Sequence, residues 1–379
     1  MYFISKTCNF ANINPEFRYP PHAPENHAKI KTMKNIKHPA KTYRMSSGLN
    51  KFQEELYKHL IEYKWNVMGI TEPGTYKGRQ YDYMIPKSYA KDDSPSPVIC
   101  EKLHPELRML QKSEFKFKQH IMAYHMASSQ CACINLFMPV LLDPNASEIL
   151  KDVPGCPEGF MEIDRTRLYK GFCFEYWGQD IKNKPAKGLL NDHTPQAGTD
   201  ADVAIAYIDT EGRPCIWLIE HKLAEKEFTC CGGYKSEKNE HPEFCISNNL
   251  NSLLKDNSNC RYTAVGYNYW DLTARFQSTY KCLDSDTQCP FLKGRNQLWR
   301  NQLLALALVE TGSYAHAHFS VVHHRDNHSL NASMAEYRQM ISPETPFSSF
   351  TNEDILRAAE RHSEGLQEWI GWYEKMYRM

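Results

Sequence analysis

A lysine and two acidic residues are spaced so that their side chains could meet. Glu220 and Lys222 close an apolar segment over residues 215–223, and because alternate residues of a strand face the same side, both side chains point the same way. Asp202 opens a second apolar segment over residues 202–209. The short turn between the two segments predicts a hairpin, which brings Asp202 to the same end of the sheet as Glu220.

This combination of side chains is typical of metal-assisted hydrolysis of a phosphodiester. Two carboxylates can hold one or two hard divalent cations such as Mg²⁺, which acidify water and stabilise charge on a phosphate. A lysine ammonium can orient or deprotonate the attacking water, and it offsets the growing negative charge. The alternative is a surface ion pair at the end of a strand, which is common and contributes little to stability.

Periodic patterns elsewhere predict the elements that would position these residues. Alternating apolar and aromatic residues predict two further strands, over residues 167–178 and 317–324. Apolar residues at helical spacing predict helices at four places: residues 48–65, most of 103–142, 296–312 and 353–378. Ser128 or Ser129 is a candidate cap between two helices within residues 103–142. Strands and helices in this order predict an α/β core with helices before and after it.

Composition and charge bound the class of protein. The 45 Lys and Arg balance the 45 Asp and Glu, so no global field favours nucleic acid or a membrane surface. Residues 1–50 are locally basic and contain prolines, which predicts an irregular arm, either a solvated tail or a phosphate-binding segment. Residues 51–379 are expected to form one domain, with a core at about 103–325 and a cysteine-bearing insertion at about 226–292. We find no run long enough to span a membrane and no signal-peptide pattern, which predicts a cytoplasmic protein.

An ordered set of short motifs resembles one nuclease superfamily. Asp202 followed by Glu220-x-Lys222 resembles the PD-(D/E)xK nucleases, and within them the chain is similar to a family of bacterial restriction endonucleases. His221 and Leu223 depart from that family, which usually has aromatic residues at these two positions. The other matching blocks are YDYMIP at residues 81–86, SSQ and Asn135 within 128–137, FEYWG at 174–178, TDAD at 199–202 and RNQLLA at 300–305.

The resemblance implies a fold, an activity and a set of site residues. The implied fold is a restriction-endonuclease-like core, in which helices flank a mixed central sheet. The implied activity is Mg²⁺- or Mn²⁺-dependent cleavage of DNA that leaves a 5′-phosphate, in restriction-type defence, with a homodimer as one possible state. Asp202 and Glu220 become metal ligands and Lys222 the residue that positions water. Asp200 lies on the same face as Asp202 and could substitute for it, while Glu175 is either a further acidic ligand or a strand-end charge bonded to backbone.

Three other polar residues are candidates by the same resemblance. Glu114 is expected on the helix before the sheet, where such nucleases often carry a carboxylate, or as a solvated helix residue. Gln302 and Arg300, on the helix over residues 296–312, are candidate contacts to the DNA backbone, and solvation on the helix surface is the alternative.

The thirteen cysteines leave two interpretations open. Without a secretion signal they suggest reduced thiols or metal ligands rather than disulfides. Cys230, Cys260, Cys282 and Cys289 are candidate ligands of zinc or of an iron–sulfur cluster, which some nucleases of the superfamily carry, but no Cys-x-x-Cys is present and free buried thiols are the alternative. Other hypotheses for the whole chain are a catalytically silent DNA-binding module, an iron–sulfur nuclease of repair or adaptive immunity, and a metal-stapled interaction protein.

Overall fold

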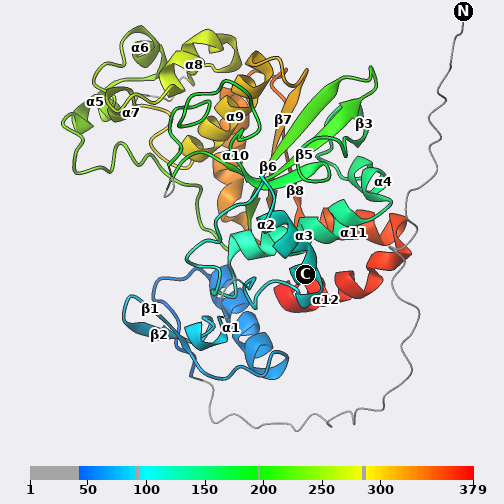
Figure 1. Ribbon diagram of the computed structural model, residues 1–379. Coiled ribbons are helices and arrows are strands. Elements are labelled where there is room, and N and C mark those ends of the chain that lie inside the picture. Colours follow the sequence, from blue (N-terminus) through cyan, green and yellow to red (C-terminus); the bar gives the residue numbers. More distant parts are fainter. Residues whose placement is uncertain (1–41, 91–93, 195–196, 284–286) are drawn as a thin grey trace, which may run out of the picture. The chain divides into compact units, whose positions relative to one another are not determined.

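The computed structural model describes residues 42–90, 94–194, 197–283 and 287–379 (Figure 1). Most of the basic arm expected over residues 1–50 lies outside the described residues. Residues Tyr43–Met379 form one compact unit, and it contains all the elements described below.

A mixed six-stranded sheet is the centre of this unit. Its order is β3-β5-β6-β7-β8, and β4 also pairs with β5. β3, β4 and β6 run antiparallel to β5, whereas β7 runs parallel to β6 and β8 parallel to β7. The expected α/β fold with a mixed central sheet is therefore confirmed. The strands are β3 (Phe160–Ile163), β4 (Phe172–Tyr176), β5 (Ala201–Asp209), β6 (Pro214–Lys222), β7 (Ala317–His323) and β8 (Phe347–Thr351).

Both faces of the sheet are covered, which explains why β6 is apolar at nearly every position. Trp217 and Ile219 pack into one apolar core, whereas Ile216 and Leu218 pack into a second core on the opposite face. The first core includes the apolar residues of α3, and the second includes those of α9 (Figure 1). The central strand β6 is therefore shielded from solvent along its length, and its charged residues lie where the strand ends.

Twelve helices and a small hairpin surround the sheet in the described part of the chain. The hairpin is β1 (Gly74–Tyr76) and β2 (Arg79–Tyr81). The helices before the strands of the central sheet are α1 (Lys51–Asn66), α2 (His104–Gln111), α3 (Ser129–Leu142) and α4 (Ala146–Lys151). Those after them are α5 (Pro242–Ser247), α6 (Leu250–Lys255), α7 (Arg261–Ala264), α8 (Tyr269–Arg275), α9 (Arg295–Glu310), α10 (Asn331–Met340), α11 (Asn352–His362) and α12 (Gln367–Tyr377). Among the described residues no helix is long and apolar enough to cross a membrane.

The structure corrects the length of two expected helices. Residues 112–128 between α2 and α3 are irregular, because the Ser113 hydroxyl donates to the Leu110 carbonyl and accepts from the Phe115 N–H, which closes a turn after α2. The single helix expected over residues 353–378 is also wrong. Ser363 is extended, with φ −144° and ψ 110°, and its hydroxyl donates to the Asp143 carboxylate at 2.7 Å, so α11 ends there and α12 begins after a short 3₁₀ turn.

Candidate active site

Asp202, Glu220 and Lys222 converge at one end of the β5–β6 hairpin. Val203 pairs with Ile219 across the hairpin, so Asp202 lies beside Glu220. Oδ2 of Asp202 accepts a hydrogen bond from the backbone N–H of His221 at 2.7 Å. Nζ of Lys222 lies 2.6 Å from Oε1 of Glu220. The hairpin thus brings together the three side chains that the strand alternation predicted.

Two amide side chains from α9 complete the surroundings of Glu220. Nε2 of Gln297 donates to Oε1 of Glu220 at 2.7 Å, and Nδ2 of Asn301 donates to Oε2 at 2.7 Å. Sequence reasoning missed both residues. Their spacing of four positions places them on the same face of a helix, which is the signal that could have found them. Glu220 is therefore held by Lys222 and by two neutral donors.

Glu175 occupies a strained position beside this cluster. Its φ is +52°, a left-handed conformation that is uncommon for a residue other than glycine, and it lies inside β4. Oε1 of Glu175 accepts from Nε2 of Gln130 at 2.8 Å, and Oε1 of Gln130 accepts from the His120 N–H at 2.8 Å. Strain of this kind persists where the surrounding structure imposes it, often at functional sites.

Burial and mutual repulsion shape the protonation of the acidic cluster. Burial and the Asp200 carboxylate raise the pKa of Glu175, against the hydrogen bond from Gln130. Burial and the Glu220 carboxylate raise the pKa of Asp200 and of Asp202. Burial opposes the charge on Lys222, but the Glu220, Glu225 and Asp202 carboxylates raise its pKa above the ordinary value. Burial therefore favours the neutral carboxyl form of these acidic groups, and the positive charge of Lys222 opposes this effect at Asp202.

A cavity of about 440 Å³ opens onto the acidic cluster. Asp202 and Glu175 line it, together with Ser129 and Gln130 at the start of α3. The side chain of Ser128, which the sequence suggested as a cap, accepts from the Cys131 N–H at 3.4 Å. The start of α3 therefore forms part of the wall of this cavity, beside the acidic residues that line it.

The structure also gives the surroundings of three further residues that the sequence singled out. Glu114 is in the turn after α2 and not on a helix, so its expected position is wrong. Arg300 donates to Asn296 and to Thr199, both at 3.0 Å, and Gln302 is buried. The Arg300 guanidinium thus bonds Thr199, which lies three residues before Asp202, and the Gln302 side chain is enclosed in the protein.

The cysteines are free thiols throughout the described residues. Sγ of Cys230 lies 3.7 Å from the Glu227 carboxylate, whereas Sγ of Cys260 accepts from the Trp270 indole at 3.2 Å. Burial raises the pKa of the Cys289 thiol. The backbone N–H of Cys289 donates to the Cys245 carbonyl at 2.8 Å. Sγ of Cys282 lies 3.7 Å from the carbonyl oxygen of Leu283. A zinc or iron–sulfur site at these cysteines stays a prediction.

No group of three or more His, Cys, Asp or Glu side chains in the described ranges is arranged so that it could hold a metal ion. This finding is compatible with Mg²⁺, because that ion is usually bound by one or two carboxylates together with water and substrate phosphates. It gives no support to a site of four cysteines, which requires all its ligands from the protein.

Comparison with known proteins gave one match. The family described as "Restriction Endonuclease associating with ARP" matches residues 20–378. No curated protein and no solved structure matches the chain. The matched range contains the whole β5–β6 hairpin, α3 and α9, and so every residue of the site described above.

Proposed function

Since the family match spans most of its length, the chain belongs to the restriction endonucleases described as associating with ARP, and we propose that it is a divalent-cation-dependent nuclease of the PD-(D/E)xK type that hydrolyses DNA. The observation that carries the proposal is the meeting of Asp202, Glu220 and Lys222 where β5 begins and β6 ends. A surface ion pair would not be buried, whereas Glu220 and Lys222 are 3% and 7% exposed.

Asp202 and Glu220 would hold the cation. Their carboxylate oxygens are hard ligands, the kind that Mg²⁺ and Mn²⁺ prefer. Their burial and mutual repulsion make a nearby positive charge favourable, as the raised pKa of Asp202 indicates. When bound, a divalent cation would lower the pKa of water and offset charge on the phosphate.

Lys222 acts as a cation and not as a base in this proposal. Its pKa is raised by the three carboxylates around it, so the ammonium stays protonated at neutral pH. A protonated amine cannot take a proton from water, but it can donate hydrogen bonds that orient the water and can stabilise the developing charge on the phosphate. Of the two roles that the sequence left open for this lysine, orientation is the one that its surroundings favour.

Glu175 is proposed as a further acidic group on the cavity side. It lines the cavity, and its raised pKa keeps a proton available near neutral pH. Gln130 fixes its orientation from the first turn of α3. A carboxyl group so placed could share the cation or exchange a proton with water in the cavity.

The test is cleavage of supercoiled plasmid with Mg²⁺ or Mn²⁺. Wild type is compared with Glu220→Gln and Lys222→Met, and the exposed Glu211→Gln on the β5–β6 turn is the matched control. The proposal expects nicking or linearisation that requires the cation, survives in Glu211→Gln and is lost by at least about 100-fold in the two site variants. Sedimentation of the protein on DNA would test the predicted homodimer separately.

Two outcomes would overturn the proposal. Equal cleavage by wild type and both site variants would assign the activity to a contaminant. Binding of DNA by wild type without cleavage under any divalent cation, on methylated, unmethylated and single-stranded DNA, would indicate the catalytically silent binding module.

A further inference from the structure

A second cavity lies between α10, β8 and the end of β7. Its volume is about 570 Å³. The polar residues that line it are basic or neutral, and among its lining residues, which all belong to the described chain, none is acidic. They include His323, Arg325, His328, Asn331, Arg338 and Ser349.

This groove begins one strand away from the candidate active site. His323, the last residue of β7, is the parallel register partner of Lys222. Thr351 of β8 is in turn the partner of His323, and β8 is the edge of the sheet (Figure 1). Neighbouring strands are about 4.8 Å apart, so the groove runs about 10 Å outward from Lys222. That distance corresponds to about three nucleotides at about 3.4 Å each along one strand of a duplex.

Glu220 and Lys222 also point to the face of the sheet that carries the groove. Met334 of α10 and Phe347 of β8 line the groove and belong to the same apolar core as Leu218. Leu218 alternates with Glu220 and Lys222 on β6, so these three side chains point to that face. The cavity that Asp202 lines and the groove that His323 lines open at the same end of the sheet, so a strand of nucleic acid bound at that cavity would reach the groove around this end.

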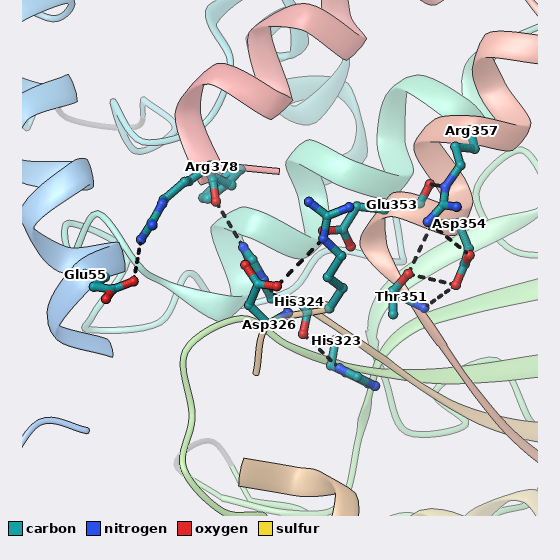
Figure 2. A network of polar contacts seen from close by, with 11 residues as sticks. Glu55, His323, His324, Asp326, Thr351, Glu353, Asp354, Arg357 and Arg378 are labelled. Carbon is teal, nitrogen blue, oxygen red and sulfur yellow. Dashed lines mark hydrogen bonds and ion pairs between the residues drawn. The ribbon is translucent and has the colours of Figure 1, made fainter. Parts of the chain in front are cut away.

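Of the two arginines that line the groove, Arg325 forms ion pairs with carboxylates of the described residues and Arg338 does not. Arg338 donates to the backbone carbonyls of Thr345 and Pro343, and within the described ranges no ion pair joins it to a carboxylate. Arg325 is paired at 3.3 Å with the buried Glu353 and at 3.7 Å with Asp326. Figure 2 labels both of these acidic residues. His328 and Asn331 are exposed at the mouth of the groove. The lining thus offers N–H donors and positive charge over an open surface.

We propose that this groove binds the phosphodiester backbone of the DNA strand next to the scissile phosphate. The inference rests on the proposed function, and it adds a place where the substrate is held. Arg, His, Asn and Ser donors toward phosphate oxygens are the usual means by which a protein positions a duplex without reading its sequence. The groove would therefore contribute affinity and register, and not sequence preference.

The sharpest test adds a negative charge to the groove without disturbing the fold. Asn331 lies in the groove at the first position of α10, and the next residue, Ala332, is exposed but does not line it. A glutamate at either position lies in the first turn of the helix, where an acidic side chain stabilises the helix. Asn331→Glu and Ala332→Glu therefore have the same effect on net charge and a similar effect on helix stability. They differ in that only Asn331→Glu places its carboxylate in the groove.

Binding to a fluorescent duplex is measured in Ca²⁺ over a range of salt concentrations, and plasmid cleavage is measured in Mg²⁺. We expect Asn331→Glu to weaken binding by about tenfold and to reduce the slope of log K against log salt by about 1, equally for unrelated sequences. Ala332→Glu should bind like wild type. A second variant, Arg338→Gln, should weaken binding in the same direction.

The outcomes separate this inference from the proposed function. Equal binding by Asn331→Glu and Ala332→Glu, with cleavage intact, would overturn the groove and leave the nuclease standing. If Asn331→Glu weakened the binding of inorganic pyrophosphate but not of DNA, the inference would also be overturned, since the groove would then bind free phosphates. Wild type that neither binds nor cuts DNA would overturn both.

Discussion

The ammonium of Lys222 lies 2.6 Å from Oε1 of Glu220, two residues earlier on β6, and both side chains are nearly inaccessible to solvent. A charge in such surroundings is costly unless it is paired. Glu220 has two further donors, Gln297 and Asn301, whereas Lys222 depends on carboxylates for its compensation. The pair is therefore both a feature of the proposed chemistry and a constraint on stability.

Removal of one member of this pair should destabilise the fold more than removal of both charges. Lys222→Met leaves a buried carboxylate without its ammonium, and we expect a loss of about 3 kcal/mol in the free energy of unfolding. Glu220→Gln in the Lys222→Met background should recover at least half of that loss. Urea unfolding without divalent cations measures both. A loss below about 1 kcal/mol in Lys222→Met would show that solvent reaches the pair.

The two amides of α9 should tune how tightly the site holds a cation. Gln297→Met or Asn301→Leu removes a donor that orients Glu220, and we expect the Mg²⁺ concentration for half-maximal cleavage to rise by about 10- to 100-fold. The exposed Gln339→Met on α10 is the matched control for Gln297→Met. An unchanged Mg²⁺ dependence with a lower maximal rate would contradict a role in holding the ligand.

The strained backbone of Glu175 should be visible in stability. Glu175→Ala keeps a side chain at φ +52°, whereas Glu175→Gly removes the steric cost. Both variants lose the carboxylate and its bond to Gln130, so we expect equal loss of cleavage. We also expect Glu175→Gly to be more stable than Glu175→Ala by about 1 kcal/mol. Thermal or urea unfolding compares them, and the reverse order would exclude backbone strain at this residue.

His324 should make the fold sensitive to acid. Its Nδ1 accepts from the N–H of Asp326 at 3.1 Å, and both residues are labelled in Figure 2. Its Nε2 lies 3.2 Å from the Tyr377 carbonyl oxygen, an arrangement that suits the neutral ring. Burial lowers its pKa to about 4. The unfolded chain then binds the proton more readily, so stability falls as the pH drops from about 6.5 to about 4, by up to about 3 kcal/mol.

The variant His324→Gln should show a flatter dependence of unfolding free energy on pH across this window, even if it is less stable at pH 7. Unfolding in urea at several pH values measures the slope. A slope that is the same with and without His324 would show that other groups cause the acid sensitivity.

Local patterns of the sequence determined much of the fold and singled out Glu220 and Lys222, whereas the choice of Asp202 over Asp200 rested on the family resemblance. The two-residue period of β5 and β6 and the short turn between them predicted the hairpin, and a hairpin is a local structure whose pairing follows from adjacent residues. The same alternation placed Glu220 and Lys222 on one face, and of the two expected caps, Ser128 and Ser129, Ser128 is the one that caps α3. The ends of long helices were less certain, because a distant partner such as Asp143, which bonds Ser363, decided where α11 stops.

Tertiary structure decided what surrounds these residues. Gln297 reaches Glu220 across 77 positions of the chain, and Gln130 reaches Glu175 across 45. Arg300 was a candidate for contact with DNA but is turned inward toward Thr199. The raised pKa of Asp202 and the charge of Lys222 likewise depend on burial between two apolar cores. Desolvation and long-range contacts arise from packing, which no local pattern of residues encodes, so the sequence named the central charged residues and the fold determined their chemical state.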